Sequence, residues 1–169
     1  METWACVRTR RTTREFRPEP VPEPVIRRIL EAGRLAPSAM NRQPWHFVVV
    51  RDRERLKALA DACFTGRFVA GAAFAVVVAV DPRNDYHAID GARAVQQMEV
   101  VAWDAGVGMC WIGGFDAARV SALVALPAGW KVLTVLAFGY PAREGGPRRK
   151  GARKPFDQVV SWERFGARA

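Results

Sequence analysis

The sequence predicts a single domain that combines α-helices and β-strands. The chain has 169 residues, of which 50% are hydrophobic. A chain of this size buries roughly 70% of its unfolded surface in one core and is too short for two ordinary domains. Segments of helical periodicity alternate with β-branched segments, without internal duplication or low-complexity blocks. We therefore expect one α+β domain over residues 1–169.

The first predicted helix lies between about residues 25 and 35. Alternate prolines between Pro18 and Pro24 keep the chain extended up to about residue 23, because proline cannot donate within a helix or strand. Apolar residues then recur at helical spacing, and Pro37 ends the pattern. These residues are Val25, Ile26, Ile29, Leu30, Gly33 and Leu35.

Two strands and a second helix are predicted next. Residues 46–51 form a short β-branched strand, and Asp52 can cap a helix that extends to about Cys63. Residues 73–80 form a second, fully buried strand. The longest apolar run, residues 68–80, is well short of the roughly 20 residues that a membrane helix needs. No membrane span is therefore expected.

The second half of the chain begins with a long helix over about residues 86–105, which Gly106 can end. Its apolar stripe consists of small residues that suit core packing and could also form a dimer seam. A short strand over 109–112, a helix from a cap at Asp116 to Leu123 and a strand over 131–138 follow. The stripe contains Ala88, Ala92, Val95, Met98, Ala102 and Ala105.

The C-terminal tail combines a polar stretch with several large apolar residues. Residues 143–153 contain glycine, proline and charge but little apolar content, so they should cross a surface. The apolar residues of the tail are Phe156, Val159, Val160, Trp162 and Phe165. Because the tail is long and carries aromatic residues, we expect it to embrace a second copy of the protein.

The formal net charge of +9 makes nucleic acid the first partner to consider. The arginines are scattered, with clusters only at residues 8–17 and 143–154. No zinc-finger, RNP or helix-turn-helix pattern accompanies them. We therefore do not expect nucleic acid to be the main ligand.

The cysteines and histidines do not form a recognisable reactive or metal site. Cys6, Cys63 and Cys110 are far apart and should be reduced and inert. With two histidines a histidine-rich metal centre is excluded, and no metal is expected, although carboxylates could hold a hard cation. The N-terminus has no apolar stretch typical of a secretory signal, so the expected location is cytoplasmic.

Two segments on either side of the first helix suggest a site for a phosphorylated, planar ligand. In residues 10–16, arginine side chains could clamp a phosphate through charge-assisted hydrogen bonds. In residues 37–45, a hydroxyl and two carboxamides suit a polyol and a heteroaromatic edge. Alternatively, the arginines are a solvated charge cluster and the amides are turn residues. The side chains concerned are Arg10, Arg11, Arg14, Ser38, Asn41 and Gln43.

Other motifs are weaker. Residues 106–108 imitate the start of a dinucleotide fingerprint, but the third glycine is missing and the segment follows a helix rather than a strand. No phosphate-binding Gly-Lys-Ser/Thr loop or serine nucleophile elbow is present. Gly113 and Gly114 could let the backbone lie against a flat ligand, or could form an ordinary tight turn.

Residues 10–16 and 41–47, together with the helix end at residues 35–38, resemble the opening of the nitroreductase family of flavoenzymes. Residues 106–114, 138–141 and 153–160 resemble later landmarks of that family in the same order, so that the likeness covers nearly the whole chain. Thr12 stands where serine is common, and Met40 replaces a smaller residue. The chain is also short, without room for a helical insertion over the substrate, which implies an open active site.

The resemblance implies a mixed, mainly antiparallel sheet flanked by helices, in an intertwined homodimer with C-terminal tail exchange. It implies FMN in each of two sites at the dimer interface. Arg10 and Thr12, with Arg11 beside them, match residues that hold the phosphate and ribityl chain, and Arg153, helped by Lys150, matches a distant basic group on the same phosphate.

The remaining matched positions lie around the flavin ring. Arg14 matches the basic residue near the pyrimidine edge, where negative charge appears in reduced flavin. Pro37, Ser38, Asn41 and Gln43 match the set presented by the other subunit. The backbone of Ile112, Gly113 and Gly114 matches the segment beside the central ring. No catalytic acid or base is expected, because the cofactor carries the chemistry.

The expected function is an FMN-dependent oxidoreductase that passes hydride from NADH or NADPH to a small-molecule acceptor by a ping-pong mechanism. Nitroaromatics, quinones and related compounds are the expected acceptors. One alternative is a specialised flavin-modifying or flavin-consuming enzyme of the same fold. Another is a non-catalytic basic module that binds nucleic acid or an acidic partner.

Overall fold

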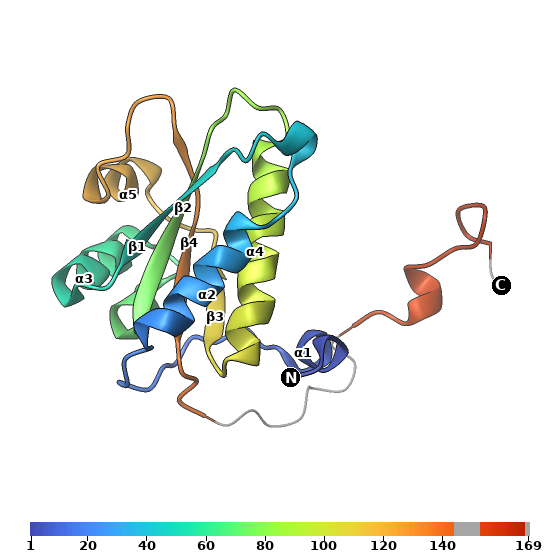
Figure 1. Ribbon diagram of the computed structural model, residues 1–169, viewed down its shortest axis with the longest axis horizontal. Helices are drawn as coiled ribbons and strands as arrows, with labels where there is room; N and C mark the ends of the chain where they lie inside the picture. The colour runs from blue at the N-terminus through green and yellow to red at the C-terminus, as the bar shows by residue number, and fades with distance from the viewer. Residues whose placement is uncertain (144–152, 168–169) are drawn as a thin grey trace.

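The computed structural model describes residues 1–143 and 153–167. The chain begins with two helices, and from the second one onward helices and strands alternate (Figure 1). The helices are α1 (Thr3–Thr9), α2 (Glu23–Arg34), α3 (Arg53–Ala62), α4 (His87–Asp104) and α5 (Ala117–Leu123). The strands are β1 (Trp45–Val50), β2 (Phe74–Val80), β3 (Gly108–Ile112) and β4 (Lys131–Gly139), and three short 3₁₀ turns lie at Ala39–Asn41, Arg67–Gly71 and Phe156–Gln158.

The four strands form one antiparallel sheet in the order β1-β2-β4-β3. Every residue of β2 is buried, because helices cover both faces of the sheet. On one face, α2 and α4 pack through Ile29 and Met98 against Phe74 and Phe138. On the other face, α3 and α5 contribute a second core (Figure 1). The α+β class and the antiparallel sheet flanked by helices are thus confirmed.

The predicted helices and strands are found within about two residues of their expected ends. Their caps explain this agreement, because a cap is a local feature of the sequence. The Asp52 carboxylate accepts a hydrogen bond from the Arg55 amide at 2.9 Å, and the Asp116 carboxylate accepts from the first amides of α5. Gly106 follows α4 with a φ of +74°, a left-handed conformation that suits glycine.

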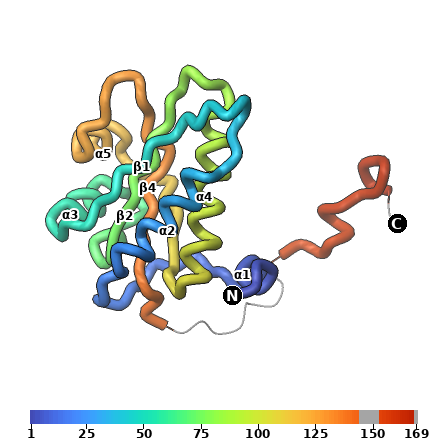
Figure 2. Tube along the Cα trace, viewed as in Figure 1, coloured from blue at the N-terminus to red at the C-terminus, as the bar shows by residue number. Residues whose placement is uncertain are grey.

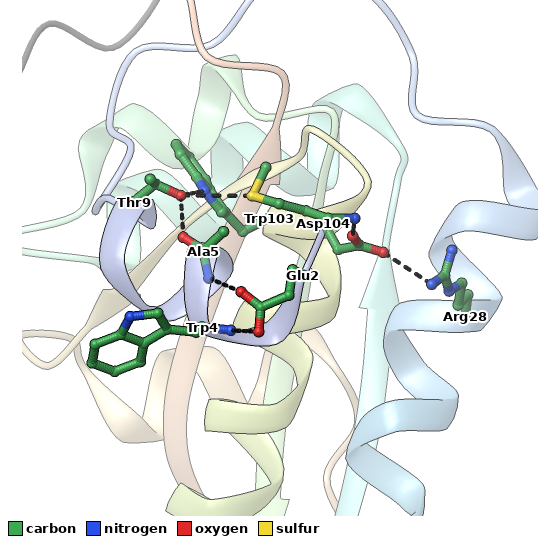
Figure 3. Close-up of polar contacts among 8 residues, drawn as sticks. Glu2, Trp4, Ala5, Thr9, Arg28, Trp103 and Asp104 are labelled. Atoms are coloured by element: carbon green, nitrogen blue, oxygen red, sulfur yellow. Dashed lines mark hydrogen bonds and ion pairs between the residues drawn. The ribbon is translucent and has the colours of Figure 1, made fainter.

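Helix α1 was not predicted, and contacts with distant residues hold it in place. Figure 3 shows that the Glu2 carboxylate caps the helix and that the Thr9 hydroxyl accepts a hydrogen bond from the Trp103 indole. The N-terminal amine pairs with Asp104, which also pairs with Arg28 of α2 at 3.0 Å. These contacts dock α1 at the C-terminal end of α4.

The C-terminal tail leads away from the sheet and its helices in Figure 1, and its aromatic side chains are exposed. Phe156 is 69% exposed, Trp162 is 52% exposed and Phe165 is fully exposed. Large apolar side chains that are exposed together, as along this tail, are typical of an interaction surface. The predicted exchange of this tail with a second copy stays a prediction.

The three cysteines are free and buried, in agreement with the expectation of inert thiols. Burial raises the pKa of the Cys63 thiol to about 11, so this side chain stays protonated at neutral pH. Within residues 1–143 and 153–167, the longest helix, α4, is not apolar enough to cross a membrane.

Candidate functional site

The arginine segment, residues 10–16, runs along the end of the sheet beside β3 and β4. The Thr13 amide donates to the Met109 carbonyl at 2.9 Å, and Phe16 forms an isolated bridge with Pro141. Two glycines that face each other across the strands, Gly108 and Gly139, make this approach possible. A Cβ at Gly108 would lie 2.2 Å from the Thr13 hydroxyl, and one at Gly139 would lie 2.8 Å from the Phe16 ring.

A cavity of about 390 Å³ lies between this segment, α4 and β3. Arg10, Thr12 and Arg14 line one side, so the structure brings together three of the residues that the sequence singled out. The other walls consist of Ala92, Val95, Gln96, Glu99, Met109 and Trp111.

None of the other six residues of this cavity was predicted as a site residue. The four residues from α4 are spaced i, i+3, i+4 and i+7, which is typical of one helix face, but only their apolar members were noticed. Glu99 accepts a hydrogen bond from the Arg10 guanidinium at 3.0 Å and another from the Gln96 amide at 3.2 Å. Met109 and Trp111 come from β3, and Trp111 is 40% exposed.

The charged side chains of the cavity affect the pKa of the buried Cys110 thiol. Burial raises the pKa of this thiol, Arg14 partly offsets the rise through its charge and a hydrogen bond, and Glu99 adds to it. Arg14 lines the cavity together with Met109 and Trp111 of β3, where a positive charge can act on a ligand.

The second segment, residues 38–43, is a compact loop with an unusual backbone. Met40, Asn41 and Gln43 have φ values of 50°, 53° and 48°, in the left-handed region that costs most residues about 1 kcal/mol or more. The Ser38 hydroxyl accepts from the Gln43 amide at 2.9 Å, and the Gln43 side chain donates to Asn41. Pro37, Asn41 and Gln43 are exposed.

A buried carboxylate on α4 anchors this loop. Asp90 is 2% exposed and accepts a hydrogen bond from the Ala39 amide at 3.0 Å. It also lies 4.0 Å from the Arg93 guanidinium. The anchor opposes the backbone strain of the loop, because breaking it would leave a buried charge without its hydrogen bond.

The two predicted halves of the site lie apart within one chain. Asp90 holds the loop near the first turn of α4, whereas Glu99 meets the arginine segment nine residues later. Nine helical residues span about 13.5 Å and two and a half turns, so the two contacts also lie on opposite sides of the helix. The path of the chain in Figure 2 shows the same separation, with the loop near one end of α4 and the arginine segment toward the other.

Another cavity, of about 780 Å³, lies between α2 and β1. Gln43 lines it together with Arg27, Arg34, Trp45 and Phe47. No residue of the arginine segment lines this cavity. Although this cavity is larger, it is therefore not the site that the sequence indicates.

The three residues of the predicted glycine segment, Ile112, Gly113 and Gly114, lie in three different environments. A Cβ at Gly113 would meet no atom within 4 Å, so the backbone there faces open space. A Cβ at Gly114 would lie 2.9 Å from the Thr65 side chain. Ile112 is 1% exposed and packs in the core, so its side chain does not line a ligand surface as a site residue would.

The basic groups fit an anion. The Nε atom of Arg11 is buried and has no hydrogen-bond partner among the described residues, an arrangement that an added acceptor such as a phosphate oxygen would satisfy. Arg153 is exposed, and Lys150 lies outside the described residues.

The sheet, its two helical layers and the arginine-lined cavity define an α+β protein with a site suited to a phosphorylated ligand. The family model described as the nitroreductase family matches residues 7–82 and 65–140. The chain belongs to the nitroreductase family.

Known relatives support this assignment over most of their length. A protein of Archaeoglobus fulgidus, whose name places it among the NADH dehydrogenases and NAD(P)H nitroreductases, is 36% identical over 152 residues, which cover 85% of this chain and 87% of that protein. A crystal structure with the same type of name from Bacteroides thetaiotaomicron has a TM-score of 0.89 at 27% identity and covers 98% and 99% of the two chains. A Desulfovibrio desulfuricans protein described as a nitroreductase in complex with FMN has a TM-score of 0.83 at 30% identity, with 98% of each chain covered.

Proposed function

We propose that this protein is an FMN-dependent oxidoreductase that takes hydride from NADH or NADPH and passes it to a nitroaromatic, a quinone or a related small molecule. The observation that carries the proposal is the cavity lined by Arg10, Thr12 and Arg14, together with the Nε of Arg11 in the same segment, which has no partner among the described residues. Membership of the nitroreductase family and the FMN complex of the Desulfovibrio relative support the same cofactor.

In this proposal the arginine segment holds the phosphate end of the cofactor. Arg10 and Arg11 donate to the phosphate, with Arg153 and Lys150 as more distant basic groups, and Thr12 donates to the ribityl chain. Hydrogen bonds to a charged group are each worth roughly 1.5–3 kcal/mol, so these residues supply much of the affinity.

Around the flavin ring, the backbone of Gly113 and the charge of Arg14 have separate roles. Gly113 leaves its space open for a flat ring, and Arg14 places a positive charge beside the pyrimidine edge. A positive charge there favours the more negative, reduced form of a flavin and so raises its reduction potential. When bound, FMN would supply the hydride chemistry, first accepting hydride from the nicotinamide and then donating it to the acceptor.

We infer that the second half of each site comes from another copy of the chain. Ser38, Asn41 and Gln43 lie beyond α4 from the arginine segment, so one chain does not bring both halves to one ligand. A homodimer with exchanged tails would bring them together and would also cover the exposed aromatic residues of the tail.

The first test is the visible absorption spectrum of the purified protein before and after incubation with FMN. A yellow protein that retains FMN through gel filtration supports the proposal. Arg10→Ala and Arg153→Ala should each retain less FMN, by about tenfold in affinity, whereas Arg14→Ala should mainly lower the flavin reduction potential. A protein that takes up no FMN, or phosphate-site variants with unchanged FMN affinity, would contradict these assignments.

Steady-state kinetics distinguish the alternatives. Oxidation of NADH or NADPH with added acceptor, and parallel double-reciprocal plots, would support the ping-pong mechanism. Loss of flavin in proportion to turnover would instead identify a flavin-consuming enzyme. Salt-dependent binding to DNA or RNA without any flavin would support the non-catalytic basic module.

A further inference from the structure

The cavity that we assign to the flavin phosphate contains an acidic side chain among its arginines. Glu99 is 12% exposed at its side chain and Arg10 is 27% exposed, and their charged atoms lie 3.0 Å apart. Gln96 donates to the second carboxylate oxygen of Glu99 at 3.2 Å. The carboxylate is therefore held against the guanidinium, at the wall of the cavity rather than in solvent.

We propose that Glu99 competes with the cofactor phosphate for Arg10 and so reduces the preference of this protein for a phosphorylated flavin over an unphosphorylated one. The inference rests on the proposed function, because it takes the 390 Å³ cavity as the phosphate end of the flavin site. It concerns the strength of phosphate recognition, which the family assignment leaves open.

The competition follows from the charges. A phosphate monoester carries between about 1.5 and 2 negative charges at pH 7. To reach Arg10 it must displace the Glu99 carboxylate or bind the remaining guanidinium donors with that carboxylate close by. Both routes cost binding free energy, because charges in a partly buried cavity are screened much less than charges in water.

The same contact stabilises the protein without ligand. Glu99 satisfies Arg10 while the phosphate is absent, so removing its charge leaves the guanidinium short of an acceptor. A phosphate would then supply the missing acceptor. Neutralising Glu99 should therefore weaken the free protein and strengthen its complex with a phosphorylated ligand.

The test compares FMN with riboflavin, which lacks the phosphate, on the full chain with Glu99→Gln. Flavin fluorescence titration should show that FMN binds about tenfold more tightly to the variant than to the unaltered protein, with riboflavin affinity changed less than about twofold. Glu54→Gln is the matched control, since Glu54 lies on α3, pairs with Lys57 and is 78% exposed at its side chain. This control should bind both flavins as the unaltered protein does.

A second readout keeps the test independent of folding defects. Without flavin, Glu99→Gln should unfold at a lower temperature than the unaltered protein, and saturating FMN should raise its Tm by more. In the Arg10→Ala background, Glu99→Gln should change the ratio of FMN to riboflavin affinity by less than about threefold, because the contested guanidinium is gone.

Two results would overturn the inference. One is an unchanged ratio of the FMN and riboflavin affinities in Glu99→Gln, and the other is weaker FMN binding by the variant. Each of these leaves the proposed function standing, since the unaltered protein still binds flavin. Failure of the unaltered protein to bind either flavin would instead refute the proposed function and this inference together.

Discussion

Gly113 and Gly114 are neighbours in the sequence, yet their surroundings differ. Gly113 faces open space, whereas Gly114 packs against Thr65, whose backbone amide also donates to the Gly114 carbonyl at 3.3 Å. Only Gly113 therefore offers a surface to a ligand. The sequence predicts both glycines as flavin contacts or as a plain turn, and the structure assigns packing to Gly114.

Substitution of the two glycines should affect different properties: Gly113→Ala should weaken FMN binding, and Gly114→Ala should lower stability. Gly113→Ala should change the free energy of unfolding by less than about 0.5 kcal/mol, because its methyl group meets no atom of the protein. It should weaken FMN binding by about tenfold, since the methyl group would occupy the space of the ring. Gly114→Ala should destabilise the protein by about 1–3 kcal/mol, because Thr65 would have to move.

Urea unfolding and FMN titration of both variants check this prediction. Gly33→Ala, where a Cβ would meet the Met98 side chain between α2 and α4, serves as a packing control on other elements. Full FMN affinity in Gly113→Ala would show that the flavin does not lie against this backbone.

At the scale of elements, α4 is the helix that holds both halves of the predicted site. Its first turn anchors the loop at residues 38–43 through Asp90, and its fourth turn meets the arginine segment through Glu99. On the opposite side of the arginine segment, the glycine pair of β3 and β4 admits Thr13 and Phe16. Each segment is thus fixed by a regular element distant from it in sequence.

Removal of the Asp90 anchor should affect stability and flavin binding together. Asp90→Ala should lower the free energy of unfolding by about 1.5–3 kcal/mol, because the Ala39 amide loses a charged acceptor. FMN should also dissociate at least several-fold faster, since the strained loop is then free to relax. Asp90→Asn, which keeps an acceptor oxygen, should recover part of both losses.

Urea unfolding and the rate of FMN release after dilution measure the two effects. Asp116→Ala is a suitable control, because it removes another carboxylate that accepts backbone amides, at the start of α5. Unchanged FMN release in Asp90→Ala would mean that the loop contributes nothing to flavin binding.

At the scale of the whole molecule, the separation of the two segments leads to a test of the shared site. If Arg10 acts in one subunit and Asn41 with Gln43 act in the other, two defective chains can complement each other. An Arg10→Ala chain paired with an Asn41→Ala/Gln43→Ala chain gives a heterodimer with one intact site and one doubly defective site.

Mixing the two variants under conditions that allow subunit exchange should therefore restore tight FMN binding at one site per heterodimer. Analytical ultracentrifugation should give about twice the 18.8 kDa chain mass for each protein. Differently tagged chains would show whether subunits exchange. If they exchange and the mixture still does not bind FMN tightly, both halves of the site lie in one subunit or one half is not used.

The success and failure of sequence-based prediction follow from the range of the interactions involved. Helices α3 and α5 begin at Asp52 and Asp116, whose caps act within three residues, so their positions could be read directly. Helix α1 could not be predicted, because its contacts with Trp103 and Asp104 join residues far apart in the sequence. Glu99 was missed for the same reason, since only its position beside Arg10 distinguishes it from an ordinary surface glutamate.

The sequence by itself determined the class of fold, most element boundaries, and the arginine and amide segments that mark the family. These features depend on periodicity, local caps and residue chemistry, all of which act over a few positions. Only the tertiary structure decided which residues share a cavity, which glycine is open, and that the two segments lie on opposite sides of α4. The reason is physical: a site depends on distances between side chains, and packing across the sheet sets those distances.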